Sequence, residues 1–108
     1  MTDPLSPLAE AALRTSELIR KEAEIARQQA ELTRSRAAAA RAVAESELQE
    51  ARLHRDPVHA APREQRVKLL ADVAHVMDSE AEVLDSEAER LLAQARTAEQ
   101  RARNNNGG

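Results

Sequence analysis

Residues 67–95 read VKLLADVAHVMDSEAEVLDSEAERLLAQA. Apolar side chains recur in this stretch every seven residues, at positions a and d of a heptad labelled a to g. With Val67 at position a, the a and d positions are apolar as far as Ala102. The a series is Val67, Ala74, Ala81, Ala88, Ala95 and Ala102, and the d series is Leu70, Met77, Leu84, Leu91 and Ala98. A repeat of this length predicts a coiled-coil helix.

A second heptad stripe precedes this one in the chain. Its a series is Ala23, Ala30, Ala37, Ala44 and Ala51, and its d series is Ile19, Ala26, Thr33, Ala40 and Glu47. Between the two stripes lies Pro57, and a proline removes a backbone donor and clashes with the preceding helical turn. The sequence therefore predicts an all-α fold, an antiparallel two-helix hairpin held by an Ala-rich coiled coil.

Proline and capping residues predict the limits of the helices. Ser6 can cap a helix that has Pro7 in its first position, because the missing N–H of a proline is not needed there. We expect a cap segment over 1–6, a long helix over 7–55 and a Pro-containing hinge over 56–61. The second helix is expected over 62–103, with Pro62 in its first turn, and a disordered Asn- and Gly-rich tail over 104–108.

The register of the hairpin is predicted from side-chain size and charge, because a positions face d positions in an antiparallel pair. We expect large residues opposite small ones: Ala51 opposite Leu70, Ala44 opposite Met77, Ala37 opposite Leu84 and Ala30 opposite Leu91. The flanking e positions then bring together Arg41 with Asp78, Arg34 with Asp85 and Arg20 with Glu99. A register one heptad away keeps the apolar seam but is expected to lose the partners of Arg20 and Arg41.

Length and composition restrict the class of protein. The 108 residues suffice for one small domain, and they include no aromatic residue and no cysteine. No apolar stretch approaches the roughly 20 residues that cross a bilayer, and the first residues lack the pattern of a signal peptide. We therefore expect a cytoplasmic protein without a membrane partner, although export without a cleaved signal stays open. The Ala- and Arg-rich usage is typical of a GC-rich bacterial gene.

Large apolar side chains also occur outside the a and d positions. They lie at c and g, and in an antiparallel hairpin the g edges adjoin, so both sets fall on one side. We call this set the c/g flank: Leu18, Ile25, Leu32, Val43, Leu69, Val73, Val76 and Val83. Burying one such side chain contributes roughly 1.5–3 kcal/mol. The flank predicts a homodimeric four-helix bundle, with another helical protein as the competing partner. The alternative is a set of scattered exposed apolar residues, which are common singly.

Chemical motifs are sparse. His54, Asp56 and His59 could be read as a metal site, but their spacing matches no ligand motif, and a polar hinge is the simpler interpretation. Arg27, Arg34, Arg36 and Arg41 could contact nucleic-acid phosphates, but the net charge of −3 and the lack of aromatic residues for stacking argue against it. No catalytic or cofactor-binding motif is present. We therefore expect a non-enzymatic structural or adaptor protein without a cofactor, and a nucleic-acid accessory protein is the alternative.

Overall fold

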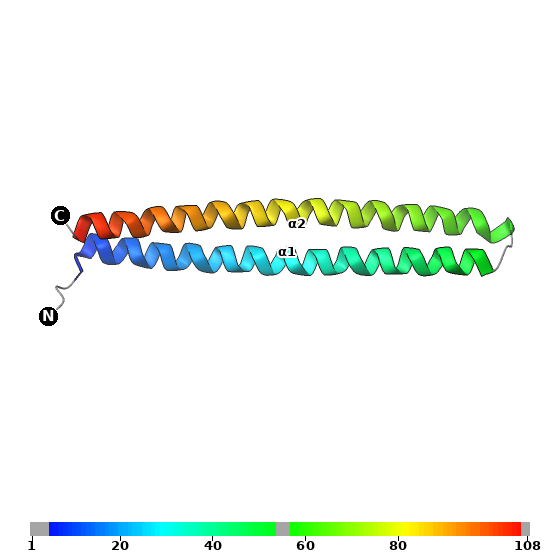
Figure 1. The fold of residues 1–108 in the computed structure, drawn as a ribbon, viewed down its shortest axis with the longest axis horizontal. Helices are drawn as coiled ribbons and strands as arrows, with labels where there is room; N and C mark the ends of the chain where they lie inside the picture. Colours follow the sequence, from blue (N-terminus) through cyan, green and yellow to red (C-terminus); the bar gives the residue numbers. More distant parts are fainter. Residues whose placement is uncertain (1–4, 54–56, 107–108) are drawn as a thin grey trace. The chain divides into compact units, whose positions relative to one another are not determined.

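The computed structural model describes residues 5–53 and 57–106. Helix α1 spans Pro7–Leu53 and helix α2 spans Pro57–Asn106. The two helices pack as an antiparallel hairpin (Figure 1). The predicted all-α class and the hairpin are therefore confirmed, while association of two hairpins stays a prediction.

Contacts divide the chain into two compact units. The terminal unit consists of Met1–Gln28 and Leu84–Gly108, and the turn unit consists of Gln29–Val83. Each helix contributes one segment to each unit. In the terminal unit the start of α1 lies beside the end of α2, and in the turn unit the end of α1 lies beside the start of α2 (Figure 1).

The predicted N-terminal cap of α1 is present. The backbone N–H of Ala9 donates to the Ser6 side-chain oxygen at 3.1 Å, and the Glu10 N–H donates to the Ser6 carbonyl at 2.9 Å. Pro7 is the first helical residue. Ser6 thus satisfies a backbone donor that has no partner within the helix, which is why the helix starts here.

The start of α2 differs from the sequence-based expectation. Helix α2 begins at Pro57 rather than at Pro62, whereas the expected end of α1 at 55 lies outside the described residues. Pro57 can open the helix because its missing N–H falls among donors that have no helical partner. Pro62 is accommodated inside α2, where it removes one backbone donor. Most of the expected hinge over 56–61 is therefore helical, and residues 54–56 lie outside the described residues.

The end of α2 also differs from the expectation. The helix continues to Asn106, whereas a tail was expected to begin at 104. Asparagine is a moderate helix former, and the strong helix breaker glycine first follows at Gly107. Residues 107–108 lie outside the described residues.

Alanine forms the core of both units. The buried apolar residues are Ala9, Ala23, Ala26, Ala30, Ala37, Ala44, Ala74, Ala81, Ala88, Ala95 and Ala102. With one exception (Ala26, at d) they occupy the a positions, and the larger d residues of α2, such as Leu70 and Met77, are half-buried. An alanine side chain is a single methyl group, so helix backbones can approach closely there. The predicted a and d seams are confirmed by this burial.

The seam of α1 begins earlier than the sequence reasoning placed it. Ala9 and Ser16 continue the a series toward the N-terminus, and both are buried. The Ser16 hydroxyl donates to the Leu13 carbonyl at 2.9 Å, so this buried polar group has a hydrogen-bond partner within its own helix. A serine can therefore occupy the seam without a partner from α2.

The expected register is wrong by one heptad. In the terminal unit, Ala26 and Ala88 belong to one buried cluster, against which Leu91 packs. Ala26 was expected opposite Ala95 instead, which is seven residues, or about 10 Å, further along the helix. The observed register is the alternative in which Ala26 lies opposite Ala88 and Ala23 opposite Leu91.

Contacts in the turn unit independently give the same register. Glu47 Oε2 lies 3.6 Å from Arg66 Nη2, and Glu50 Oε2 lies 3.9 Å from Arg63 Nη1. In the expected register Arg66 would lie about 12 Å along the axis from Glu47. Helix α2 already begins at Pro57, five residues earlier than a hinge over 56–61 would allow.

Two of the expected charge pairs nevertheless form. Arg20 Nη2 lies 2.6 Å from Glu99 Oε1 in the terminal unit, and Arg41 is paired with Asp78 in the turn unit. Side chains tilt toward the N-terminus of their own helix. In an antiparallel pair an arginine of α1 and a carboxylate of α2 therefore lean toward each other, and they meet across an offset of about 7 Å between their Cα positions along the axis. The third expected pair, Arg34 with Asp85, stays a prediction.

Within the described residues, neither helix contains an apolar stretch long enough to cross a lipid bilayer.

Replacing Ser6 by alanine removes the cap of α1 and is expected to lower the free energy of unfolding by about 1 kcal/mol. Aspartate at the same position can accept the Ala9 N–H and should retain most of the stability. Urea denaturation of the three proteins, followed by circular dichroism, measures the difference. Equal midpoints for wild type and Ser6→Ala would contradict the cap.

The alanine seam predicts strong sensitivity to side-chain size. Ala88→Leu inserts three carbon atoms at a position with 0% exposure and is expected to cost about 1–3 kcal/mol of stability. The matched control is Ala93→Leu, because Ala93 is exposed on the same helix and both residue types are good helix formers. If the two variants unfold at the same denaturant concentration, the helices are not in close contact at Ala88.

Candidate association surface

All eight residues of the c/g flank are exposed in the single chain. Their exposed fractions run from 43% at Val73 to 67% at Val83. The a and d positions of the same helices are mostly buried or half-buried. The hairpin therefore covers its seam and leaves the flank open, as the heptad positions predicted. Whether the flank forms an interface stays a prediction.

The flank is unevenly distributed between the two units. Only Leu18 and Ile25 lie in the terminal unit, both on α1, and the α2 residues at c there are the polar Arg90, Thr97 and Asn104. The other six residues lie in the turn unit and come from both helices: Leu32, Val43, Leu69, Val73, Val76 and Val83. The turn unit thus carries the part of the flank to which both helices contribute, and in the terminal unit the apolar residues lie on α1 alone.

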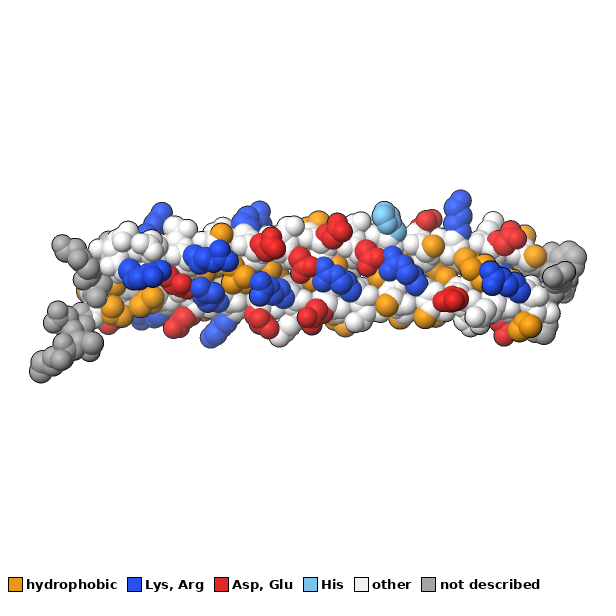
Figure 2. All heavy atoms as spheres, in the orientation of Figure 1, with side chains coloured by type: hydrophobic (Ala, Val, Ile, Leu, Met, Phe, Trp, Pro, Cys, Tyr) orange, Lys and Arg blue, Asp and Glu red, His pale blue; other side chains and the backbone are white. Residues whose placement is uncertain are grey.

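The e positions, on the other side of the seam, carry mostly charged residues, with Leu48, Ala71 and Leu92 among the exceptions. Arg20 donates from Nε to Glu99 Oε1 at 2.7 Å in addition to its contact through Nη2. On the face drawn in Figure 2, basic side chains lie along the line where the helices meet, with acidic side chains beside them. Ion pairs between the helices therefore form on this side of each unit, whereas on the flank side of the turn unit they involve Glu47, Glu50 and their partners Arg66 and Arg63.

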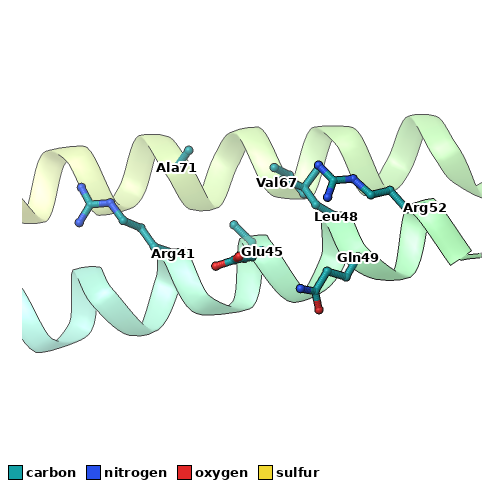
Figure 3. A pocket seen from close by; sticks show the side chains of 8 residues that line it. Arg41, Glu45, Leu48, Gln49, Arg52, Val67 and Ala71 are labelled. Atoms are coloured by element: carbon teal, nitrogen blue, oxygen red, sulfur yellow. The ribbon is translucent and has the colours of Figure 1, made fainter.

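A groove of about 370 Å³ lies on the e side of the turn unit. Ala44, Leu48, Val67 and Ala71 form its apolar part. In Figure 3, Leu48 and Arg52 extend from α1 toward Val67 on α2. The rest of its lining comes from Arg41, Glu45 and Gln49 of α1. Arg41 is already engaged by Asp78, so the groove is a gap between side chains along the seam rather than a preformed pocket for a charged ligand.

Glu47 is the charged residue of the α1 seam. It occupies a d position, where its Oε2 atom is buried and accepts no hydrogen bond among the described residues. The distance of 3.6 Å to Arg66 Nη2 places a positive charge beside this oxygen. A buried carboxylate oxygen requires such compensation, so Arg66 allows the seam to include a charge near the connection.

The candidate metal site and the candidate nucleic-acid contacts receive no support from the described residues. His54 and Asp56 lie outside the described residues, as does the side chain of His59, and among the described residues no group of metal-ligating side chains is present. Of the four arginines of the nucleic-acid alternative, Arg27 lies in the terminal unit, whereas Arg34, Arg36 and Arg41 lie in the turn unit. Arg41 is neutralised by Asp78, which reduces the positive charge available to a phosphate.

One core residue was not recognised from the sequence. Leu92, assigned to an e position among charged residues, packs against the buried cluster of Ala23, Ala26 and Ala88. The signal was its apolar character, because Leu92 directly follows the d residue Leu91 and widens the apolar stripe at this point. A strict seven-residue count excludes such a residue from the seam.

No protein-family model, curated protein or solved structure matches this chain.

The Arg20–Glu99 pair is expected to be weak. The two side chains retain 45% and 26% exposure, and exposed pairs typically contribute about 0.2–1 kcal/mol. A double-mutant cycle with Arg20→Ala and Glu99→Ala should give a coupling energy in this range, which decreases as salt is added. A coupling that is larger and insensitive to salt would show that the pair is not solvent-screened.

Proposed function

We propose that this chain is a non-enzymatic structural or adaptor protein that acts by self-association. In this proposal two hairpins pack through their c/g flanks into a four-helix bundle. A helix from another protein is the competing occupant of the same surface.

The exposure of the c/g flank is the observation that supports the proposal. Six large apolar side chains from both helices lie uncovered within the turn unit, at heptad spacing. Contiguous apolar patches of this kind usually mark interfaces, whereas single exposed apolar residues do not. The heptad spacing also matches what a further helix would bury.

The thin alanine core also supports the proposed self-association. Alanine buries little apolar area, and among the described residues no large side chain is fully buried. A small scaffold with so thin a core commonly requires an additional source of stability such as oligomerisation. Covering the flank would supply about 1.5–3 kcal/mol for each fully buried valine or leucine. Association would therefore stabilise the hairpin as well as give it a function.

A charge on the flank is expected to separate the subunits. Val76→Glu places a carboxylate in the centre of the turn-unit flank, where burial without a partner is costly. The expected result is a shift from dimer to monomer, measured by light scattering, with most of the helical circular-dichroism signal retained. Ile25→Glu, in the terminal unit, is expected to weaken the dimer less.

The matched control is His75→Glu. His75 is exposed, occupies position b and points away from both seam and flank by its heptad position. This variant should keep the mass of the wild type. If Val76→Glu also keeps that mass, the flank is not the interface.

A further inference from the structure

In the observed register, flank residues of α1 lie at nearly the same level along the helix axis as flank residues of α2 in the turn unit. Residues at one level are called a layer. Val43 of α1 and Val73 of α2 occupy one layer. The neighbouring layers pair Leu32 with Val83, Ala39 with Val76, and Ser46 with Leu69. Each layer therefore combines one residue from α1 with one from α2, and in two layers a small residue accompanies a large one.

Two opposite charges lie within this layered surface. Arg36 of α1 and Glu80 of α2 occupy g positions, are exposed, and fall into the same layer of the observed register. Among the described side chains at c and g of the turn unit, the other two charged residues, Glu50 and Arg66, already have partners in Arg63 and Glu47. Arg36 and Glu80 have neither an ion pair nor a hydrogen bond with any described side chain. They would be costly to cover with an apolar partner helix.

We infer that the occupant of the turn-unit flank is a second copy of this chain, related by a two-fold axis parallel to the helices, with Arg36 of each copy paired with the partner copy's Glu80. The inference rests on the proposed self-association and specifies its geometry. The complementary charges favour a second copy over an unrelated helix, because each copy carries both members of the pair.

A two-fold axis parallel to the helices gives favourable packing and favourable charge pairs. Rotation about this axis keeps every residue at its level along the helix axis and sets α1 of one copy against α2 of the other. All neighbouring helices are then antiparallel, as in an up-down-up-down bundle. Ala39 meets the partner copy's Val76 and Ser46 meets the partner copy's Leu69, so small residues face large ones.

An axis across the helices places the charges less well. It would set α1 against the partner copy's α1 and reverse the order of the layers. Where it passes through the layer of Val43 and Val73, Arg36 would meet the partner copy's Glu50, and Glu80 would meet the partner copy's Arg66. Glu50 and Arg66 are already paired with Arg63 and Glu47 in their own hairpin, so they would have to be shared, whereas the axis along the helices pairs Arg36 with Glu80 directly.

Charge reversal tests the inference. Arg36→Glu and Glu80→Arg are each expected to weaken the dimer by about tenfold, because two like-charged contacts replace two opposite ones in the symmetric assembly. An equimolar mixture of the two variants should dimerise about as well as the wild type. In that heterodimer the carboxylate introduced at position 36 of one chain meets the guanidinium introduced at position 80 of the other. The second contact pairs the unchanged Arg36 with the unchanged Glu80. Sedimentation equilibrium at low salt gives the dissociation constants, and native mass spectrometry identifies the heterodimer.

Controls separate this arrangement from an ion pair within one hairpin. The double variant Arg36→Glu, Glu80→Arg restores complementary charges in either case. Rescue by mixing the single variants requires that the pair lie between copies. Glu82→Arg, a charge reversal at an exposed b position, should leave the dissociation constant unchanged, and circular dichroism verifies that every variant stays helical.

The outcomes are distinct. If the double variant dimerises but the mixture does not recover, the pair lies within one hairpin and the inferred geometry is overturned, while dissociation by Val76→Glu would still support the proposed self-association. Single variants that dimerise like the wild type would likewise overturn the geometry alone. A wild-type chain that stays monomeric at all concentrations would overturn the inference and the proposed self-association together.

Discussion

Close contact between two alanine stripes is the constraint on which the rest of this structure depends. The a positions of both helices are occupied by alanine almost throughout, and in both units most of these residues are buried. Because a methyl side chain occupies so little space, the helices can approach closely, and the leucines and methionine at d are only half-buried at the edges of the contact. A seam of this kind is selective for small residues but buries little apolar area, so its contribution to stability is limited.

The same constraint explains the exposed flank. A narrow seam between two helices covers the a and d positions and leaves c and g outside. In the turn unit those outer positions carry valine and leucine on both helices, whereas in the terminal unit α2 carries polar residues such as Arg90 and Thr97 there. The hairpin alone leaves these valines and leucines exposed. The proposed association gives these side chains a partner and gives a thin core additional buried area.

Charged residues have different roles on the two sides of the seam. On the e side, Arg20 and Arg41 of α1 are paired with Glu99 and Asp78 of α2, and the pairs remain accessible to solvent. Such pairs contribute little to stability, and they form in the observed register because the side chains of antiparallel helices lean toward each other. On the flank side, Arg36 and Glu80 have no such partners among the described residues, which is the basis for assigning them to contacts between copies.

The sequence by itself determined the elements that depend on local periodicity and local hydrogen bonding. The two seams followed from the heptad repeat, the start of α1 from Ser6 and Pro7, and the exposure of the flank from its c and g positions. Only the tertiary structure decided the register and the start of α2 at Pro57. The physical reason is the uniformity of the alanine stripe: a slip of one heptad exchanges one alanine for another and changes the energy of the seam very little. The register, and with it which residues of the two helices share a layer, therefore shows only in the contacts between the helices, such as those of Ala26 with Ala88 and of Glu47 with Arg66.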